Sequence, residues 1–106
     1  MKVFISQPMG GRSEEEILNE RDRVWRKLLK LFPFEPIEVI DTYFSDYYPV
    51  ENHPGLKMLS KSLELLDKAD LVYFVKDFRQ ARGCLIEYEV ANLYGIENII
   101  VEEDER

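Results

Sequence analysis

The chain has 106 residues, 45% of them hydrophobic, and a formal net charge of −7. This length predicts a single domain over residues 1–106, and the acidic balance disfavours polymeric nucleic acid and membrane surfaces as partners. The single cysteine, Cys84, excludes an internal disulfide and a zinc site of paired cysteines. Because the apolar runs are too short to cross a membrane and the N-terminus has no signal-peptide shape, we expect a cytoplasmic protein.

The first part of the chain is predicted to form a strand, a loop, a helix and a second strand. The apolar run at 2–6 is long enough for a buried strand, and the proline and glycines of 7–12 predict a loop. Ser13, with a glutamate three residues later, has the spacing of a capping box at a helix N-terminus. This helix continues to about Phe32, and the second strand is predicted at 36–40.

The second part begins with a loop at 41–55, which holds four aromatic residues and the only histidine, His53. The following elements are then predicted in order: a helix at 56–69, a buried strand at 70–75, a polar loop at 76–83, a helix at about 84–94 ended by Gly95, and a strand at 97–103. The chain therefore alternates strands with helices.

Strands that alternate with helices predict a parallel sheet covered by helices on both faces. With right-handed crossovers, the simplest α/β architecture is a flavodoxin-like three-layer sandwich with a four-stranded parallel sheet in the order 2-1-3-4. Its crevice opens at the carboxyl ends of the first and third strands, where the winding reverses. The loops at 6–13 and 76–84 would meet there, so both are candidates for a ligand site.

Glu87 is the one charged residue on an otherwise apolar face of the 84–94 helix, because the positions that share this face are apolar or glycine. A partly desolvated carboxylate at the mouth of the crevice is a candidate nucleophile or base. The alternative is a glutamate that only interacts with the helix dipole in the first turn. Cys84, at the start of the same helix, is expected to be a small buried residue rather than a nucleophile.

The first loop has features of a ligand-binding turn. Gly10 and Gly11 would let the backbone approach a ligand closely, and Arg12 offers donors suited to a phosphate or carboxylate. The alternative is a plain turn with a solvated arginine. The aromatic residues at 43–48 either pack within their own loop or form a lid over the site, and His53 is expected at the surface.

Three segments resemble the nucleoside 2-deoxyribosyltransferase superfamily: "VFISQPMGGRS" (3–13), "KADLVYFV" (68–75) and "GCLIEYEVANLYG" (83–95). The family's pattern of a glycine, a glutamate four residues later and an alanine four residues after that is matched by Gly83, Glu87 and Ala91. The sequence of these motifs is most similar to that of a compact subgroup common in phage and bacterial genomes. The "GGR" of the first loop resembles the 2′-deoxynucleoside 5′-phosphate N-hydrolase branch.

The resemblance implies an N-glycosidase or deoxyribosyltransferase that cleaves the N-glycosidic bond of a (deoxy)nucleoside or its 5′-monophosphate. In such enzymes the glutamate that matches Glu87 attacks the anomeric carbon, and water or a second base resolves the ester. The implied substrate-binding residues are Ser6, Gln7, Met9, Gly10, Gly11, Arg12, Asp77 and Gly83. No cofactor or metal is expected, and a neighbouring subunit that completes the site predicts a homodimer or larger homo-oligomer.

The sequence departs from the family pattern at the proton donor. Catalytic members carry an aspartate before the third strand, and the corresponding place here falls at about Ser62. A tyrosine often found near the first strand is also absent. Three loop aspartates are candidates to replace the acid: Asp41, Asp46 and Asp77. An alternative function is therefore a catalytically inactive nucleotide-binding or sensing module of the same fold.

Overall fold

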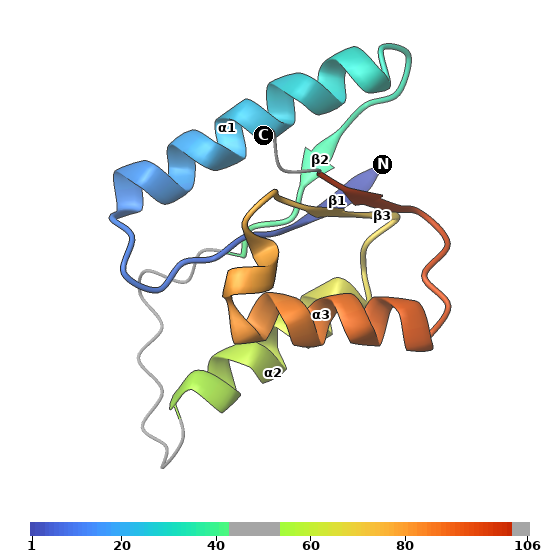
Figure 1. Cartoon of the computed structure of the whole chain (residues 1–106). Helices are drawn as coiled ribbons and strands as arrows, with labels where there is room; N and C mark the ends of the chain where they lie inside the picture. The colour runs from blue at the N-terminus through green and yellow to red at the C-terminus, as the bar shows by residue number, and fades with distance from the viewer. Residues whose placement is uncertain (43–53, 103–106) are drawn as a thin grey trace.

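The computed structural model describes residues 1–42 and 54–102 and shows an α/β fold (Figure 1). In chain order its elements are β1 (Lys2–Ser6), α1 (Glu14–Leu31), β2 (Glu38–Val39), α2 (Pro54–Leu66), β3 (Leu71–Phe74), the 3-10 turn η1 (Phe78–Gln80), α3 (Arg82–Leu93) and β4 (Ile99–Val101). The four strands form one parallel sheet in the order β2-β1-β3-β4. The predicted flavodoxin-like order 2-1-3-4 is therefore confirmed.

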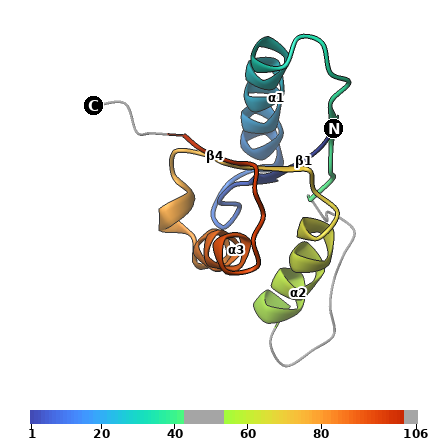
Figure 2. The same cartoon turned by 90° about the vertical axis from the view of Figure 1, so that its right-hand side faces the viewer.

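Helices cover both faces of this sheet. Figure 2 shows α1 on one face and α2 with α3 on the other. The chain winds from β1 outward to the edge strand β2 and then returns past β1 to β3, so the winding reverses between β1 and β3. The ends of these two strands are joined by a hydrogen bond from Val75 N to Ser6 O (3.2 Å). The loops after β1 and β3 consequently start side by side at the carboxyl edge.

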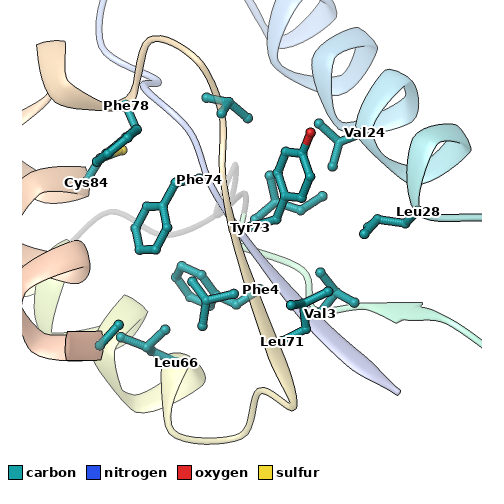
Figure 3. Packing of buried hydrophobic residues seen from close by; sticks show 14 residues of the cluster. Val3, Phe4, Val24, Leu28, Leu66, Leu71, Tyr73, Phe74, Phe78 and Cys84 are labelled. Carbon is teal, nitrogen blue, oxygen red and sulfur yellow. The ribbon is translucent and has the colours of Figure 1, made fainter. Parts of the chain in front are cut away.

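The central strand β3 supplies much of the core, since all four of its residues are buried. Its side chains alternate between the two layers: Tyr73 points toward Val24 of α1, whereas Phe74 points toward Phe78 (Figure 3). The Phe74 ring centroid lies 5.0 Å from that of Phe78 and 5.1 Å from that of Tyr88 on α3. This aromatic cluster packs η1 and α3 against the sheet and so positions the start of α3.

The N-terminus of α1 has the capping box that its sequence predicts. Ser13 Oγ accepts a hydrogen bond from Glu16 N (3.1 Å), and Glu16 Oε1 accepts one from Ser13 N (3.4 Å). The helix ends at Leu31, one residue before the predicted Phe32. The cap therefore fixes the point at which the first loop passes into the helix.

Several elements are shorter than predicted. β2 has two residues and pairs with β1 alone, within the predicted range 36–40. α2 ends at Leu66, three residues early, since the chain must turn before Asp70 N donates to Lys2 O (2.8 Å). The two remaining strands, β3 and β4, lie inside the predicted ranges 70–75 and 97–103.

The last helix, α3, is displaced by one or two residues from the predicted 84–94. It begins at Arg82, directly after η1, and ends at Leu93. Gly95 has φ of 73°, and Ile96 N donates to Ala91 O (3.0 Å), which is the Schellman arrangement of a helix end. The predicted role of Gly95 as the C′ residue is confirmed.

Candidate functional site

A cavity of about 500 Å³ opens at the carboxyl edge of β1 and β3. Most of its wall comes from the loop at 7–12, from the residues of α2 between Gly55 and Ser62, and from the segment at 80–87. Phe4 and Ile5 of β1 and Thr42 after β2 complete the described lining. This is the crevice that the strand order predicts. The volume lies in the range of small-molecule sites.

Glu87 lies in the wall of this cavity with 6% of its surface exposed. The buried residues of α3 are Cys84, Glu87 and Ala91, whose spacing of three and four places the carboxylate on the packed face of the helix. Ser6 Oγ, at the end of β1, donates a hydrogen bond to Glu87 Oε1 (3.1 Å). Burial raises the pKa of Glu87 to about 7, and the hydrogen bond from Ser6 opposes part of that rise.

Replacing Ser6 with alanine should raise the pKa of Glu87 further, because the donor that stabilises the ionised form is lost. The free energy of unfolding falls with pH until Glu87 is fully ionised in the folded protein. In the variant this fall should continue to about 1 pH unit higher than in the wild type. The free energy of unfolding, measured against pH in denaturant titrations, checks this without any substrate. Ser62→Ala, which removes a cavity hydroxyl on α2, is the control; equal profiles for both variants would contradict the prediction.

The first loop brings four of its predicted residues to the cavity wall: Gln7, Met9, Gly10 and Arg12. Gly11 is not among the described lining residues. It has φ of 76° in the turn that Arg12 N closes on Met9 O (3.2 Å), a conformation that favours glycine. Gly11 therefore shapes the loop instead of contributing to the wall.

Arg12 connects the first loop to two carboxylates. Its Nη1 lies 3.0 Å from Glu20 Oε1 on α1, and its Nη2 lies 3.4 Å from Asp77 Oδ2 in the loop after β3. Asp77 pairs with Arg12 and is not among the described lining residues of the cavity. These ion pairs join α1 to the loop after β3, and a phosphate at Arg12 would have to share the guanidinium with both acids.

Gln7 is 5% exposed and contributes to the same wall. Its Nε2 donates to Glu20 Oε1 (2.9 Å) and to Ile17 O (3.2 Å). Within residues 1–42 and 54–102, Gln7 Oε1 has no hydrogen-bond partner, and the same is true of Thr42 Oγ1. Thr42 is 4% exposed and also lines the cavity. Two buried polar atoms of the wall thus have no hydrogen-bond partner in the described part of the chain.

The start of α3 adds positive character to the wall. Ala81 caps the helix without a side-chain hydrogen bond, and the first helical bond is made by Leu85 N to Ala81 O (3.1 Å). Gly83, Arg82 and Ala81 all line the cavity. The Arg82 guanidinium lies against α2, with Nη2 3.0 Å from where a Cβ would stand on Gly55. This end of α3 is a favourable place for an anionic group.

Ser62 lies in the cavity wall. It occupies the position at which the resemblance of the sequence to the nucleoside 2-deoxyribosyltransferase superfamily would place an aspartate. Asp41, one of the candidate replacements, has an 82% exposed side chain and lies 3.4 Å from Arg21 Nη1. Asp46, together with His53 and the aromatic residues at 43–48, lies outside the described residues. Among the described lining residues, Glu87 is the only carboxylate.

Cys84 is 3% exposed and lines the cavity beside Glu87. Burial raises the pKa of its thiol to about 12, although a hydrogen bond with Ser6 acts in the opposite direction. A thiol that stays protonated is a poor nucleophile. The expected role of a small buried residue therefore agrees with its environment.

Some wall residues were missed by sequence reasoning. Thr42 follows the short edge strand, and the carboxyl-edge rule would have pointed to it. Met58 and Leu59 of α2 also line the cavity, although an apolar pattern in a helix predicts core just as well. The local sequence does not distinguish an apolar residue that packs in the core from one that lines a cavity.

Comparison with known proteins gives no relative for this chain: no family model, no curated protein and no solved structure matches it. None of the described helices is long and apolar enough to cross a membrane. Within the same part of the chain there is no group of three or more metal-binding side chains. Fold and site together define an α/β domain with one buried carboxylate in a cavity at the switch point of the sheet.

Proposed function

We propose that the protein cleaves the N-glycosidic bond of a (deoxy)nucleoside or its 5′-monophosphate, with Glu87 as the nucleophile. The observation that carries this proposal is the carboxylate of Glu87, 6% exposed and held by Ser6 Oγ in the wall of the cavity. A charged group is rarely kept in such a place without a partner of opposite charge unless it has a chemical role. The sequence resemblance assigns the same role to the same residue.

The chemistry requires an ionised carboxylate aimed at the anomeric carbon. With a pKa of about 7, Glu87 is close to half ionised at neutral pH. The hydrogen bond from Ser6 occupies Oε1, which leaves Oε2 as the attacking atom. The glycosyl ester is then resolved by water in a hydrolase or by a second base in a transferase.

The remaining groups of the wall suit a mononucleotide. Gly10 and Met9 border the cavity from the first loop, and Gly83 borders it at the start of α3. The unpaired N–H groups of a helix N-terminus and the guanidinium of Arg82 would receive a 5′-phosphate. Homo-oligomer formation and a cytoplasmic location are parts of the same proposal; Leu93 of α3, 72% exposed, offers apolar surface to a second subunit.

A second candidate is a nucleotide-binding module without turnover. Ser62 in the cavity wall favours it, because a hydroxyl is a poor proton donor for a leaving base. This candidate predicts that ligands stabilise the protein against heat and are recovered intact. The gain in stability would be about 2.7 kcal/mol at a hundredfold excess over Kd.

The experiment incubates the protein with nucleosides and their 5′-monophosphates, covering ribose and deoxyribose, and measures free base by liquid chromatography. We expect release from at least one phosphorylated substrate. Thermal stabilisation with no base released would favour the binding module instead. If the panel is neither cleaved nor bound, both candidates are wrong.

A further inference from the structure

The part of the cavity wall that residues 1–42 and 54–102 form presents a problem for a neutral substrate. When an N-glycosidic bond breaks, the bonding electrons move to the base, and a neutral base leaves well only if an acid protonates it. The described wall offers the hydroxyl groups of Ser62 and Thr42, arginine guanidinium groups and the thiol of Cys84. Hydroxyl and guanidinium groups keep their protons at neutral pH, and the thiol does so too because burial raises its pKa to about 12.

Glu87 cannot fill this gap while it acts as the nucleophile. It is the only carboxylate among the described lining residues, and attack requires its ionised form. Asp77 is held 3.4 Å from Arg12 Nη2, and Asp41 has an 82% exposed side chain. The described site therefore has a nucleophile without a partner acid.

We infer that the substrate is an N-glycoside whose base already carries a positive charge, such as a pyridinium or an N7-alkylated purine nucleotide. This inference rests on the proposed function. Glu87 Oε2 forms a bond to the anomeric carbon as the C1′–N bond breaks, and the electron pair neutralises the ring nitrogen, so no proton is needed. Water then bonds to C1′, the C1′–O bond to Glu87 breaks, the carboxylate is restored and one proton passes to solvent.

The wall also fits a cationic ring. The negative charge of Glu87 stands in a poorly solvated place, where attraction to a cation is strong. Met9 and Met58 line the cavity, and thioether sulfur makes favourable contacts with aromatic rings. Gln7 Oε1 and Thr42 Oγ1, for which the described residues offer no partner, provide an acceptor and a hydroxyl for an amide or amino substituent on the base.

Matched substrate pairs test this inference. One pair is 7-methylguanosine 5′-monophosphate with guanosine 5′-monophosphate, and the other is oxidised with reduced nicotinamide mononucleotide. Each pair shares its sugar and phosphate and differs in the charge of the base. We expect the wild-type protein to cleave at least one cationic member about 100-fold faster than its neutral partner, the factor that an absent general acid would supply. The two pairs distinguish a purinium from a pyridinium substrate.

The pH profile on oxidised nicotinamide mononucleotide, whose ring charge does not depend on pH, gives an independent readout. The rate should rise as Glu87 ionises and then stay level, because no acid has to remain protonated. A falling limb at higher pH, or a neutral member cleaved as fast as its partner, would overturn the inference and leave the proposed function standing. No cleavage of either pair or of the unmodified nucleotides, or equal cleavage by Glu87→Gln, would instead remove the proposed function.

Discussion

Replacing Glu87 with glutamine is expected to lower the rate of base release by at least about 1,000-fold. The amide has the size of the carboxylate and still accepts a hydrogen bond from Ser6 Oγ, but it cannot form the ester. Liquid chromatography of the released base measures the loss. Glu89→Gln makes the same chemical change at an exposed site on the same helix and should behave as the wild type.

The same substitution should make the fold more stable above neutral pH. Glu87 has a pKa of about 7 in the folded chain against 4.5 when exposed, so the folded state holds the proton longer. The contribution of this group to the free energy of unfolding is full below pH 4.5 and falls between pH 4.5 and 7. Above that range about 3 kcal/mol has been lost. Glu87→Gln removes this fall.

Denaturant titrations of both proteins at pH values from 4 to 8, spaced by about one pH unit, measure how the free energy of unfolding changes with pH. The wild-type free energy of unfolding should decline relative to that of Glu87→Gln, with the largest gap at pH 8. Parallel profiles, together with a rate of base release within about tenfold of the wild-type rate, would show that Glu87 is neither desolvated nor catalytic.

Replacing Glu102 with glutamine should lower the free energy of unfolding by about 2 kcal/mol at pH 7, the size of a lost charge-assisted hydrogen-bond set. Glu102 is 8% exposed and follows β4. It receives hydrogen bonds from Arg23 Nη1 (3.1 Å) and Nη2 (2.9 Å), from Lys27 Nζ (3.5 Å) and from the hydroxyl of Tyr73. Glutamine keeps one acceptor oxygen but loses the negative charge and the second acceptor, so Arg23 and Lys27 would face an NH2 donor in its place.

The pH dependence of this network has the opposite sign to that of Glu87. Burial of Glu102 opposes ionisation, but the hydrogen bonds from Arg23 and Tyr73 and the positive charges nearby outweigh it and lower its pKa to about 2. Its contribution is therefore full above pH 4.5 and is lost as the pH falls toward 2. In Glu102→Gln, stability should change less over this acid range than in the wild type.

Chemical denaturation at pH 7 measures the effect, and Glu97→Gln is the matched control at an exposed position just before β4. A loss in Glu102→Gln of less than about 0.5 kcal/mol, the size of an ordinary surface change, would contradict a stabilising role for the network.

Local patterns were enough to predict the fold. The capping box at Ser13 and the C′ glycine at Gly95 gave helix ends within one or two residues, because both signals lie within a few residues of the end that they mark. The continuous apolar run of β3 predicted a strand covered on both faces. The largest error was at α2, which ends three residues before the predicted residue 69, because the turn into β3 is set by the bond from Asp70 N to Lys2 O, a contact between residues far apart in the sequence.

The site was less accessible to sequence reasoning. The burial of Glu87 followed from its helix face, but the partners of Arg12 did not, since Asp77 is separated from it by 65 residues. In the same way Arg23 and Glu102 are 79 residues apart and meet only when β4 joins the sheet. Spacing along the chain predicts which side chains share a face, whereas the choice of ion-pair partner depends on the packed layers.

Trapping the glycosyl ester is the most direct measurement of the proposed chemistry. The protein would be mixed with 7-methylguanosine 5′-monophosphate or nicotinamide mononucleotide, quenched in acid during turnover, digested and mapped by mass spectrometry. We predict a ribosyl phosphate adduct on the peptide that contains Glu87 and none in Glu87→Gln. Base release with the adduct on another residue, or with no adduct at any quench time, would contradict nucleophilic attack by Glu87.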